Sequence, residues 1–205
     1  MRVFLTGASS GIGAALARHY GARGATLGLV ARREAALAEV GRSAGAPFEA
    51  YPCDVRDLGA MAAAAGDFIA RHGVPDLVIA NAGISHGTLT GNAEDARTFA
   101  EILEVNVLGM VHTFHPFVAP MRERGSGTLA GIASVAGFRG LPGASAYSAS
   151  KAAAIRYLEA LRVEMRASGV RVKTICPGYV ESPMTERNPY PMPFLLPAEE
   201  AARRI

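Results

Sequence analysis

Short apolar runs of strand length alternate along the chain with longer segments of helical period. The strand candidates are residues 2–6, 25–31, 48–52, 76–80, 127–133 and 170–175. The helix candidates lie near residues 12–23, 34–43, 58–72, 93–123 and 146–167, with a further one at 197–205. A run such as 76–80 is apolar almost throughout, which is typical of a parallel strand buried on both faces. The alternation therefore predicts an α/β fold with a doubly wound parallel sheet and helices on both faces.

The length of 205 residues suits one well-buried domain, and no linker or repeat divides the chain. We therefore expect a single domain over 1–205. The net charge of +3 is small and the basic residues are scattered, which argues against a nucleic-acid partner and a membrane-surface patch. No leader precedes the first strand candidate and no apolar run could cross a bilayer, so we expect a cytoplasmic protein. Cys53 and Cys176 are expected to be reduced.

A glycine-rich turn follows the first strand candidate and leads into the first helix. Glycines at this place let a dinucleotide pyrophosphate approach backbone N–H groups at the helix N-terminus. The spacing differs from the common GxGxxG pattern, and a glycine turn alone is weak support; its place between strand and helix strengthens it. The residues predicted to bind the cofactor here are Gly7, Ser9, Ser10, Gly11, Ile12 and Gly13.

The end of the second strand candidate bears on the choice of dinucleotide. An NAD site usually has a carboxylate there for the ribose 2′-hydroxyl, whereas this chain has Ala31 followed by Arg32 and Arg33. A guanidinium can bind a 2′-phosphate through two hydrogen bonds. We therefore predict NADP(H) over NAD(H), the alternative being that both arginines are solvated residues opening the next helix.

Tyr147 and Lys151 stand four residues apart, thirteen residues after Ser134. On a helix, positions i and i+4 share a face, so the phenol and the ammonium can lie side by side. A fixed cation makes a neighbouring phenol more acidic, which suits it to proton transfer near neutrality. The alternative is an ordinary surface pair, because the YxxxK spacing is a loose pattern.

With the glycine turn, the Ser-Tyr-Lys spacing and the alternation together, the chain resembles the short-chain dehydrogenase/reductase family from Arg2 to about Ser182. Further motifs carry the resemblance: Asp54-Val55 after the third strand, Asn81-Ala82-Gly83 after the fourth, Asn106 in the fourth helix, and 177–182 after the sixth strand. The resemblance implies a Rossmann-like fold. It adds these residues to the expected cofactor site, beside Tyr147 and Lys151: Asp54, Val55, Asn81, Ala82, Gly83, Pro177, Gly178, Val180 and Ser182.

The resemblance also implies roles for four catalytic residues. Tyr147 would exchange a proton with the substrate oxygen, and Ser134 would hydrogen-bond that oxygen. Lys151 would lower the pKa of the phenol and hold the nicotinamide ribose. Asn106 would position a water that connects Lys151 to solvent. The implied enzyme is an oxidoreductase that transfers hydride between NADP(H) and a small carbonyl or alcohol substrate, as a homodimer or homotetramer.

Other interpretations stay open at this point. A sugar-nucleotide epimerase or dehydratase of related fold, or a non-catalytic dinucleotide-binding regulator, would share the glycine turn. The segment 182–197, rich in proline and large apolar groups, is either a lid over an apolar substrate or a loop packed on the core or on a second subunit. His112 and His115 stand three apart, but no further ligand is evident, so no metal is expected. Whether the natural chain extends past Ile205 also stays open.

Overall fold

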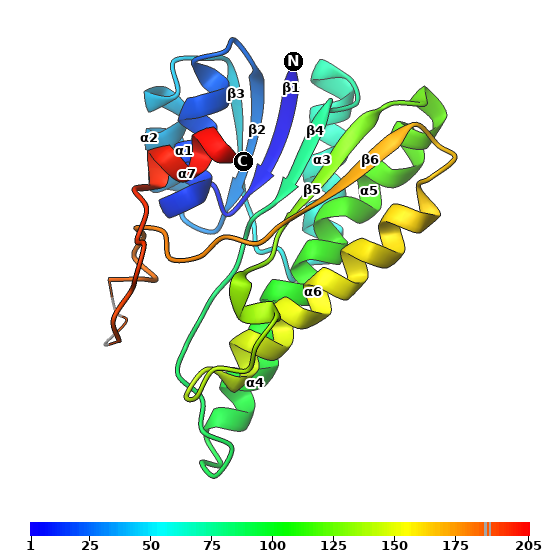
Figure 1. Ribbon diagram of the computed structural model, residues 1–205. Coiled ribbons are helices and arrows are strands. Elements are labelled where there is room, and N and C mark those ends of the chain that lie inside the picture. Colours follow the sequence, from blue (N-terminus) through cyan, green and yellow to red (C-terminus); the bar gives the residue numbers. More distant parts are fainter. Residues whose placement is uncertain (187, 189) are drawn as a thin grey trace.

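The computed structural model describes residues 1–186, 188 and 190–205. Its centre is a six-stranded sheet in the order β3-β2-β1-β4-β5-β6, in which every pairing is parallel (Figure 1). The strands are β1 Arg2–Thr6, β2 Thr26–Ala31, β3 Phe48–Pro52, β4 Leu77–Ala80, β5 Gly127–Ile132 and β6 Val170–Ile175. The order reverses beside β1, where the chain crosses from β3 to β4. Such a switch point is where an open α/β sheet binds its ligand, at the carboxyl ends of its strands.

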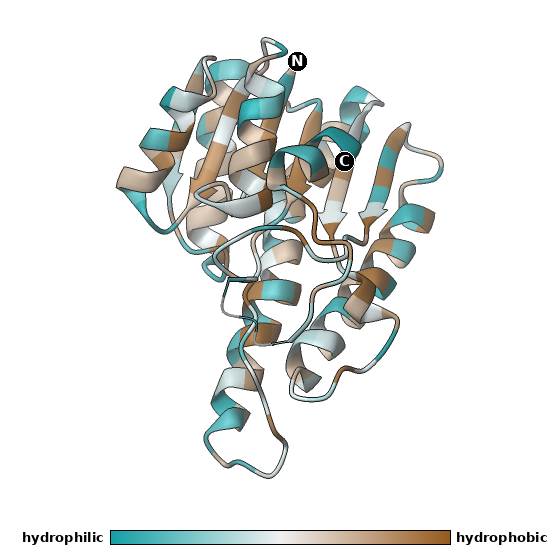
Figure 2. Ribbon diagram, turned by 60° about the vertical axis from the view of Figure 1, so that its left-hand side comes forward, coloured by the Kyte–Doolittle hydropathy of each residue, from teal (hydrophilic) through white to brown (hydrophobic). Residues whose placement is uncertain are grey.

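Helices cover both faces of this sheet, as the alternation predicts. The α-helices are α1 Gly11–Gly21, α2 Glu34–Ser43, α3 Leu58–His72, α4 Asp95–Leu103, α5 Gly109–Arg124, α6 Ser145–Glu164 and α7 Ala198–Arg204. One buried core lies between the sheet and α1, α2 and α7, and the other between the sheet and α3, α5 and α6. Figure 2 shows apolar strands enclosed by helices with largely hydrophilic outer surfaces.

The alternation of side chains along β1 divides it between the two cores. Val3 and Leu5 belong to one core and Phe4 to the other, as the period of two in a strand requires. Phe4 packs edge-on against Phe68 of α3, with ring centroids 5.6 Å apart. Gly28 of β2 makes room for this pair, because a Cβ there would come within 2.6 Å of Phe4. The sheet is thus fixed by interlocking residues on both faces.

The long fourth helix is interrupted. The sequence predicts one helix over 93–123, whereas the structure has α4, a π-helical turn η1 at Glu104–Leu108, and then α5. A π-turn is rare and frequently marks a functional site, and this one carries Asn106. The other predicted boundaries agree within one to three residues.

The combined stretch Asp95–Arg124 is long and apolar enough to cross a membrane. In the structure its large side chains Phe114, Phe117 and Met121 have no exposed surface and belong to the core against α3 and the sheet. Core helices pass the same test of length and hydropathy, so we interpret this stretch as a core element.

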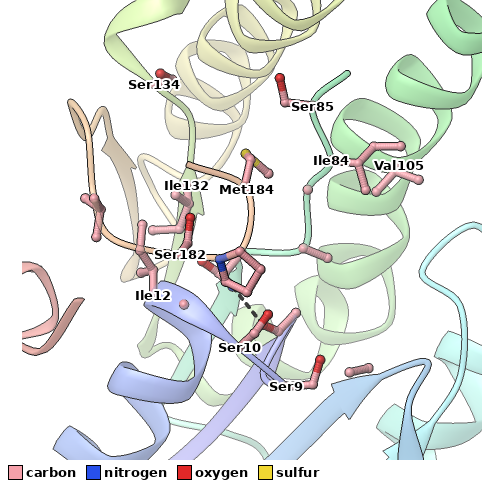
Figure 3. Close-up of a pocket in the computed structure, with 18 of the residues that line it drawn as sticks. Ser9, Ser10, Ile12, Ile84, Ser85, Val105, Ile132, Ser134, Ser182 and Met184 are labelled. Carbon is pink, nitrogen blue, oxygen red and sulfur yellow. Dashed lines mark hydrogen bonds between the residues drawn. The ribbon is translucent and has the colours of Figure 1, made fainter. Parts of the chain in front are cut away.

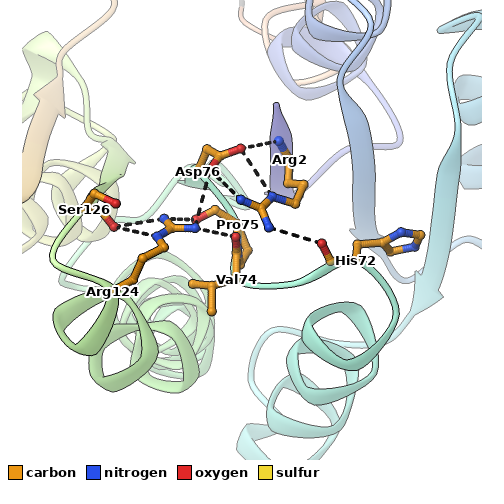
Figure 4. Close-up of polar contacts among 7 residues, drawn as sticks. All are labelled: Arg2, His72, Val74, Pro75, Asp76, Arg124 and Ser126. Atoms are coloured by element: carbon orange, nitrogen blue, oxygen red, sulfur yellow. Dashed lines mark hydrogen bonds and ion pairs between the residues drawn. The ribbon is translucent and has the colours of Figure 1, made fainter.

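An arginine–aspartate network fastens the amino ends of the strands, opposite the ligand edge (Figure 4). Asp76 accepts hydrogen bonds from the backbone N–H of Arg2, at 2.8 Å, and from its guanidinium, at 3.0 Å. The Arg124 guanidinium donates to the carbonyls of Val74 and Pro75, both at 2.6 Å, and to Ser126. The two arginines hold the pKa of the Asp76 carboxyl below its usual value, despite an opposing effect of burial. The network therefore serves the sheet rather than a ligand.

Candidate active site

A cleft with a volume of about 520 Å³ opens at the carboxyl ends of the strands. Figure 3 shows Ser9 and Ser10 of the glycine turn at one end, and Ser85 and Ser134 at the other. Most of the predicted site residues line this cleft: Gly7, Ser9, Ser10, Gly11, Ile12, Arg32, Arg33, Asp54, Val55, Asn81, Ala82, Gly83, Ser134, Tyr147, Lys151, Pro177, Gly178, Val180 and Ser182. Motifs spread over almost the whole chain therefore meet in one elongated site.

The glycine turn is shaped as a cradle for an anion. Gly7 and Gly11 have φ values of 66° and 51°, in the left-handed region that favours glycine. A Cβ on Gly7 would come within 2.7 Å of Ala82, and one on Gly11 within 2.9 Å of the Ser182 side chain. Ser10 is the N-cap of α1, but its hydroxyl makes no capping bond. Because the first N–H groups of a helix have no partner within it, this end of the cleft fits a pyrophosphate.

Gly13 does not line the cleft, and its contact with a cofactor stays a prediction. A Cβ at Gly13 would lie 2.1 Å from the Gly7 carbonyl and 2.7 Å from the Asn81 side chain. Asn81 donates from that amide to the carbonyls of Thr6 and Gly7, at 3.1 and 3.2 Å. Gly13 is therefore needed so that α1 can pack closely against the turn.

Arg32 and Arg33 follow the carboxyl end of β2, where the adenosine ribose of a dinucleotide would bind. The Arg33 guanidinium approaches the Ser9 hydroxyl within 3.5 Å, so Arg33 reaches across to the glycine turn. Arg33 is also the N-cap of α2 but makes no side-chain capping bond. Two cations and a hydroxyl thus stand at this rim of the cleft.

Asp54, at the end of β3, is held by its neighbour Arg56. The guanidinium donates to both carboxylate oxygens, at 2.8 Å for the closest pair, and the Arg56 backbone N–H donates at 2.9 Å. These hydrogen bonds lower the pKa of Asp54 against an opposing effect of burial. Arg56 also lies 3.7 Å from Glu101 and from Glu104. The Asp54 carboxylate is thus ionised and fixed at the place predicted for the adenine.

At the other end of the cleft, Tyr147 meets Ser134. Ser134 follows β5, and its hydroxyl oxygen accepts a hydrogen bond from the Ala136 N–H at 3.1 Å, which leaves its proton free to donate. Burial raises the pKa of Tyr147, and the side chain of Ser134 lowers it in part. The net direction is upward, so the phenol is protonated near neutrality and can act as a proton donor.

Lys151 lies on the same face of α6 as Tyr147, with its ammonium 5.6 Å from the centre of the phenol ring. The ammonium donates to the Ile132 carbonyl at 2.9 Å. Burial lowers the pKa of Lys151 to about 8, with a small opposing effect from the Cys176 thiol. The side chain therefore remains mostly charged at neutral pH, in a place where a charge is costly.

The predicted effect of Lys151 on the acidity of the phenol stays a prediction. The ammonium is directed at the Ile132 carbonyl, and the group that lowers the pKa of Tyr147 is Ser134. The reason is that a buried ammonium hydrogen-bonds the nearest strong acceptor, which here is a backbone carbonyl at the end of β5.

Asn106 is buried, with 1 % of its surface exposed, and it does not line the cleft. Its amide oxygen accepts from the Ile84 N–H at 2.8 Å, and its amide nitrogen donates to the Ile84 carbonyl at 3.0 Å and to the Ser150 hydroxyl at 2.9 Å. Ser150 in turn donates to the Tyr147 carbonyl at 2.7 Å. The Asn106 side chain thus joins η1 to the loop after β4 and to α6, and its role toward a water stays a prediction.

Several cleft residues escaped the sequence analysis. They are Ala31, Cys53, Ile84, Ser85, His86, Val105, Ile132 and Ala133. Pro183, Met184 and Thr185 line the cleft as well, and they belong to the segment 182–197 that the sequence analysis singled out. Ile84, Ser85 and His86 follow the Asn-Ala-Gly motif directly, so a continuation of that motif along the loop would have included them.

The segment 182–197 begins in the cleft and ends outside it. Pro183, Met184 and Thr185 line the cleft, whereas Phe194 has 94 % of its surface exposed. A backbone bridge between Val180 and Leu196 joins the two ends of the loop. Phe194 is therefore not packed on the core, which was one interpretation of this segment. Arg187 and Pro189 lie outside the described residues.

No group of three metal-binding side chains occurs in the part of the chain that the structure describes. His112 makes a hydrogen bond of 2.9 Å with the Val55 carbonyl, which gives it a structural role. Both cysteines are free thiols, as expected.

Comparison with known proteins shows the family of this chain. The sequence model of the short chain dehydrogenase family matches residues 1–191. The chain belongs to the short-chain dehydrogenase family. An uncharacterized oxidoreductase of Myxococcus xanthus is 40 % identical over 200 residues, which cover 96 % of this chain and 79 % of that protein. This short-chain dehydrogenase is accordingly an oxidoreductase with the Rossmann fold of its family.

Two solved structures show the same fold with different dinucleotides. A 3-ketoacyl-(acyl-carrier-protein) reductase of Brucella melitensis, complexed with NADH, has a TM-score of 0.92 at 25 % identity and covers 99 % of this chain and 88 % of its own. A variant of actinorhodin polyketide ketoreductase with NADPH has a TM-score of 0.88 at 28 % identity and covers 99 % and 87 %. Short-chain dehydrogenases of this shape thus bind either nicotinamide dinucleotide.

Proposed function

We propose that this short-chain dehydrogenase is an NADPH-dependent ketone reductase in which Tyr147 is the general acid. The observation that carries the proposal is the meeting of a protonated phenol and a serine hydroxyl at one end of a cleft whose other end fits a pyrophosphate. With its pKa above neutrality, the Tyr147 phenol holds a proton at pH 7 and can donate it to a ketone, which is the direction of reduction. At higher pH the same residue would serve the reverse reaction, oxidation of an alcohol.

Each residue of the site has a distinct task in this proposal. The nicotinamide cofactor supplies hydride when bound. Tyr147 donates its proton to the substrate oxygen, and Ser134 donates a hydrogen bond to the same oxygen and stabilises the charge that develops on it. Lys151 supplies positive charge beside the phenol, which stabilises the phenolate left after proton transfer. Gly7, Gly11 and the start of α1 would hold the pyrophosphate.

The substrate class proposed is a ketone on an acyl chain. Both compared structures are named as reductases of ketoacyl or polyketide ketones. Met184 lines the cleft. Exposed apolar side chains also occur on the loop after β5, at Phe138 and Leu141. These groups would contact an apolar chain on either side of the reacting carbon.

Screening a panel of carbonyl compounds for NADPH oxidation tests the proposal. The panel should hold 3-ketoacyl thioesters, simple ketones, aldehydes, steroids and ketose sugars. Ketoacyl thioesters are expected to give the highest kcat/KM. Turnover of sugars alone would contradict the substrate class. The epimerase and regulatory interpretations are not favoured, because the relatives are oxidoreductases and the site holds the complete set of Ser134, Tyr147 and Lys151.

NADPH is proposed as the preferred cofactor because of Arg32 and Arg33. We expect Arg32→Ala to weaken NADPH binding about tenfold and to leave NADH binding nearly unchanged, since only NADPH carries the 2′-phosphate. Dissociation constants for both cofactors, measured by fluorescence titration, check this. Arg42→Ala is the matched control, because Arg42 is an exposed arginine on α2 that does not line the cleft. Tighter binding of NADH by the unaltered protein would contradict the preference.

A homodimer or homotetramer is proposed, built through the outer faces of α5 and α6. Ala149 and Ala160 are exposed on α6 and would let a second helix approach closely. Sedimentation velocity at micromolar concentration should give a species of twice or four times the chain mass of 21.4 kDa, and Ala160→Glu should shift it toward the monomer. A monomer over the whole concentration range would remove this proposal. A cytoplasmic location remains a prediction.

A further inference from the structure

The helix that carries Tyr147 and Lys151 lacks a capping side chain of its own. The N-cap of α6 is Ala144, which has no side-chain acceptor and makes no capping bond. The first N–H groups of any helix need partners from outside the helix, and a Ser, Thr, Asp or Asn at the N-cap usually provides one. A hydroxyl must therefore come from elsewhere, or the first turn of α6 is left to fray.

Thr88, in the loop after β4, provides this hydroxyl. Its oxygen accepts a hydrogen bond from the Ala146 N–H at 3.2 Å and lies 3.0 Å from the Ser145 hydroxyl. Ala146 is the second residue of α6, which is where an ordinary N-cap side chain would bond. Thr88 also donates its own N–H to the Gly143 carbonyl at 2.9 Å, and only 3 % of its surface is exposed.

The capped N–H belongs to the residue directly before Tyr147. The Thr88 bonds reach the backbone on the N-terminal side of Tyr147, and Ser150 bonds its carbonyl on the other side. The peptide that carries the phenol is thus held from two directions. The same loop lines the cleft through Ser85 and His86, on the side where a substrate would enter.

We propose that Thr88 is a positioning residue for Tyr147: it caps α6 from a neighbouring loop and so holds the phenol against Ser134. The expected effect on kcat rests on the proposed function. The expected effect on the position of Tyr147 does not depend on it. Small misplacements of an acid–base group cost large factors in rate. Loss of the Thr88 hydroxyl should therefore reduce turnover more than it reduces cofactor binding.

Thr88→Val removes the hydroxyl at nearly constant volume, and Thr88→Ser retains it. Tyrosine labelled with ¹³C at Cζ gives six signals in this chain, of which the Tyr147 signal is assigned by its loss in Tyr147→Phe. We expect Thr88→Val to shift that signal and to speed amide exchange at Ala146 about tenfold, whereas Thr88→Ser leaves both unchanged. At saturating NADPH and ketone, kcat should fall about tenfold in Thr88→Val and recover in Thr88→Ser.

A second cap in the same protein provides the control. Asp57 caps α3, with its carboxylate accepting from the Ala60 N–H at 2.9 Å, and it does not line the cleft. Asp57→Ala should lower thermal stability without moving the Tyr147 signal or kcat. An unmoved Tyr147 signal in Thr88→Val would overturn the proposal, as would a moved signal with unchanged kcat. If the unaltered protein reduces no ketone, the proposed function fails, and the Tyr147 signal still decides the positioning role.

Discussion

Replacing Tyr147 by phenylalanine is expected to lower kcat for ketone reduction by about 10³, while the dissociation constant for NADPH changes by no more than about twofold. The Tyr147 phenol has a pKa raised by burial, so it holds its proton at neutral pH, and it lies near Ser134. Phenylalanine fills the same space but has no proton to donate. Steady-state kinetics with a ketone from the panel, beside NADPH titration, measure both quantities.

Tyr157→Phe is the matched control for this change. Tyr157 lies on α6 as well, stacks against Phe114 at 6.5 Å between ring centres, and does not line the cleft. Its loss of a hydroxyl should leave kcat close to that of the unaltered protein. If Tyr147→Phe kept most of its activity, a different proton donor would have to be sought among Ser134 and water.

Replacing Lys151 by methionine is expected to lower kcat by about 10², because the phenolate formed during reduction loses its neighbouring positive charge. Lys151→Arg should not restore activity, since a broader, planar guanidinium does not fit the place of a compact ammonium. Lys173→Met is the control: Lys173 is the other lysine of the chain, is exposed on β6 and does not line the cleft. Equal losses in both variants would contradict a specific role for Lys151.

The same variant should also change how stability depends on pH. Burial lowers the pKa of Lys151 to about 8 from 10.5, so the folded protein loses this proton before the unfolded chain does. Below pH 8 the buried charge destabilises the fold fully, and the cost diminishes as the pH rises from 8 toward 10.5. We therefore compare the free energy of unfolding of the unaltered protein with that of Lys151→Met. The difference, unaltered minus variant, should increase by about 2 kcal/mol between pH 7 and pH 9.5. Urea unfolding at both pH values measures it, and a constant difference would contradict the buried charge.

The sequence was sufficient for the sheet because its signal is local and repeated. Apolar runs such as 76–80 mark buried strands, and the glycines of the first turn mark a backbone conformation that other residues rarely adopt. The same patterns place the motifs at the carboxyl ends of the strands, so many of the residues that line the cleft could be named before the structure. The π-turn at Glu104–Leu108 has no such pattern, and the fourth helix was therefore predicted as continuous.

Long-range contacts decide the directions of side chains, and the sequence pattern does not show these contacts. Helical spacing places Lys151 beside Tyr147, but it does not reveal that the Ile132 carbonyl lies within reach of the ammonium. Likewise, nothing in the sequence around Asn106 shows that its amide bonds Ile84 and Ser150. Thr88 caps a helix that begins 57 residues later in the chain, and no pattern along the sequence announces such a pairing.

Transfer of a label from the cofactor to the product tests the central claim most directly. The protein is incubated with NADPH deuterated at C4 of the nicotinamide and with the ketone that the panel favours, and the alcohol is examined by mass spectrometry. We predict one deuterium on the carbinol carbon in the unaltered protein and almost no labelled alcohol with Tyr147→Phe. Alcohol without label would contradict hydride transfer from the cofactor. Equal amounts of labelled alcohol from both proteins would contradict its coupling to a proton from Tyr147.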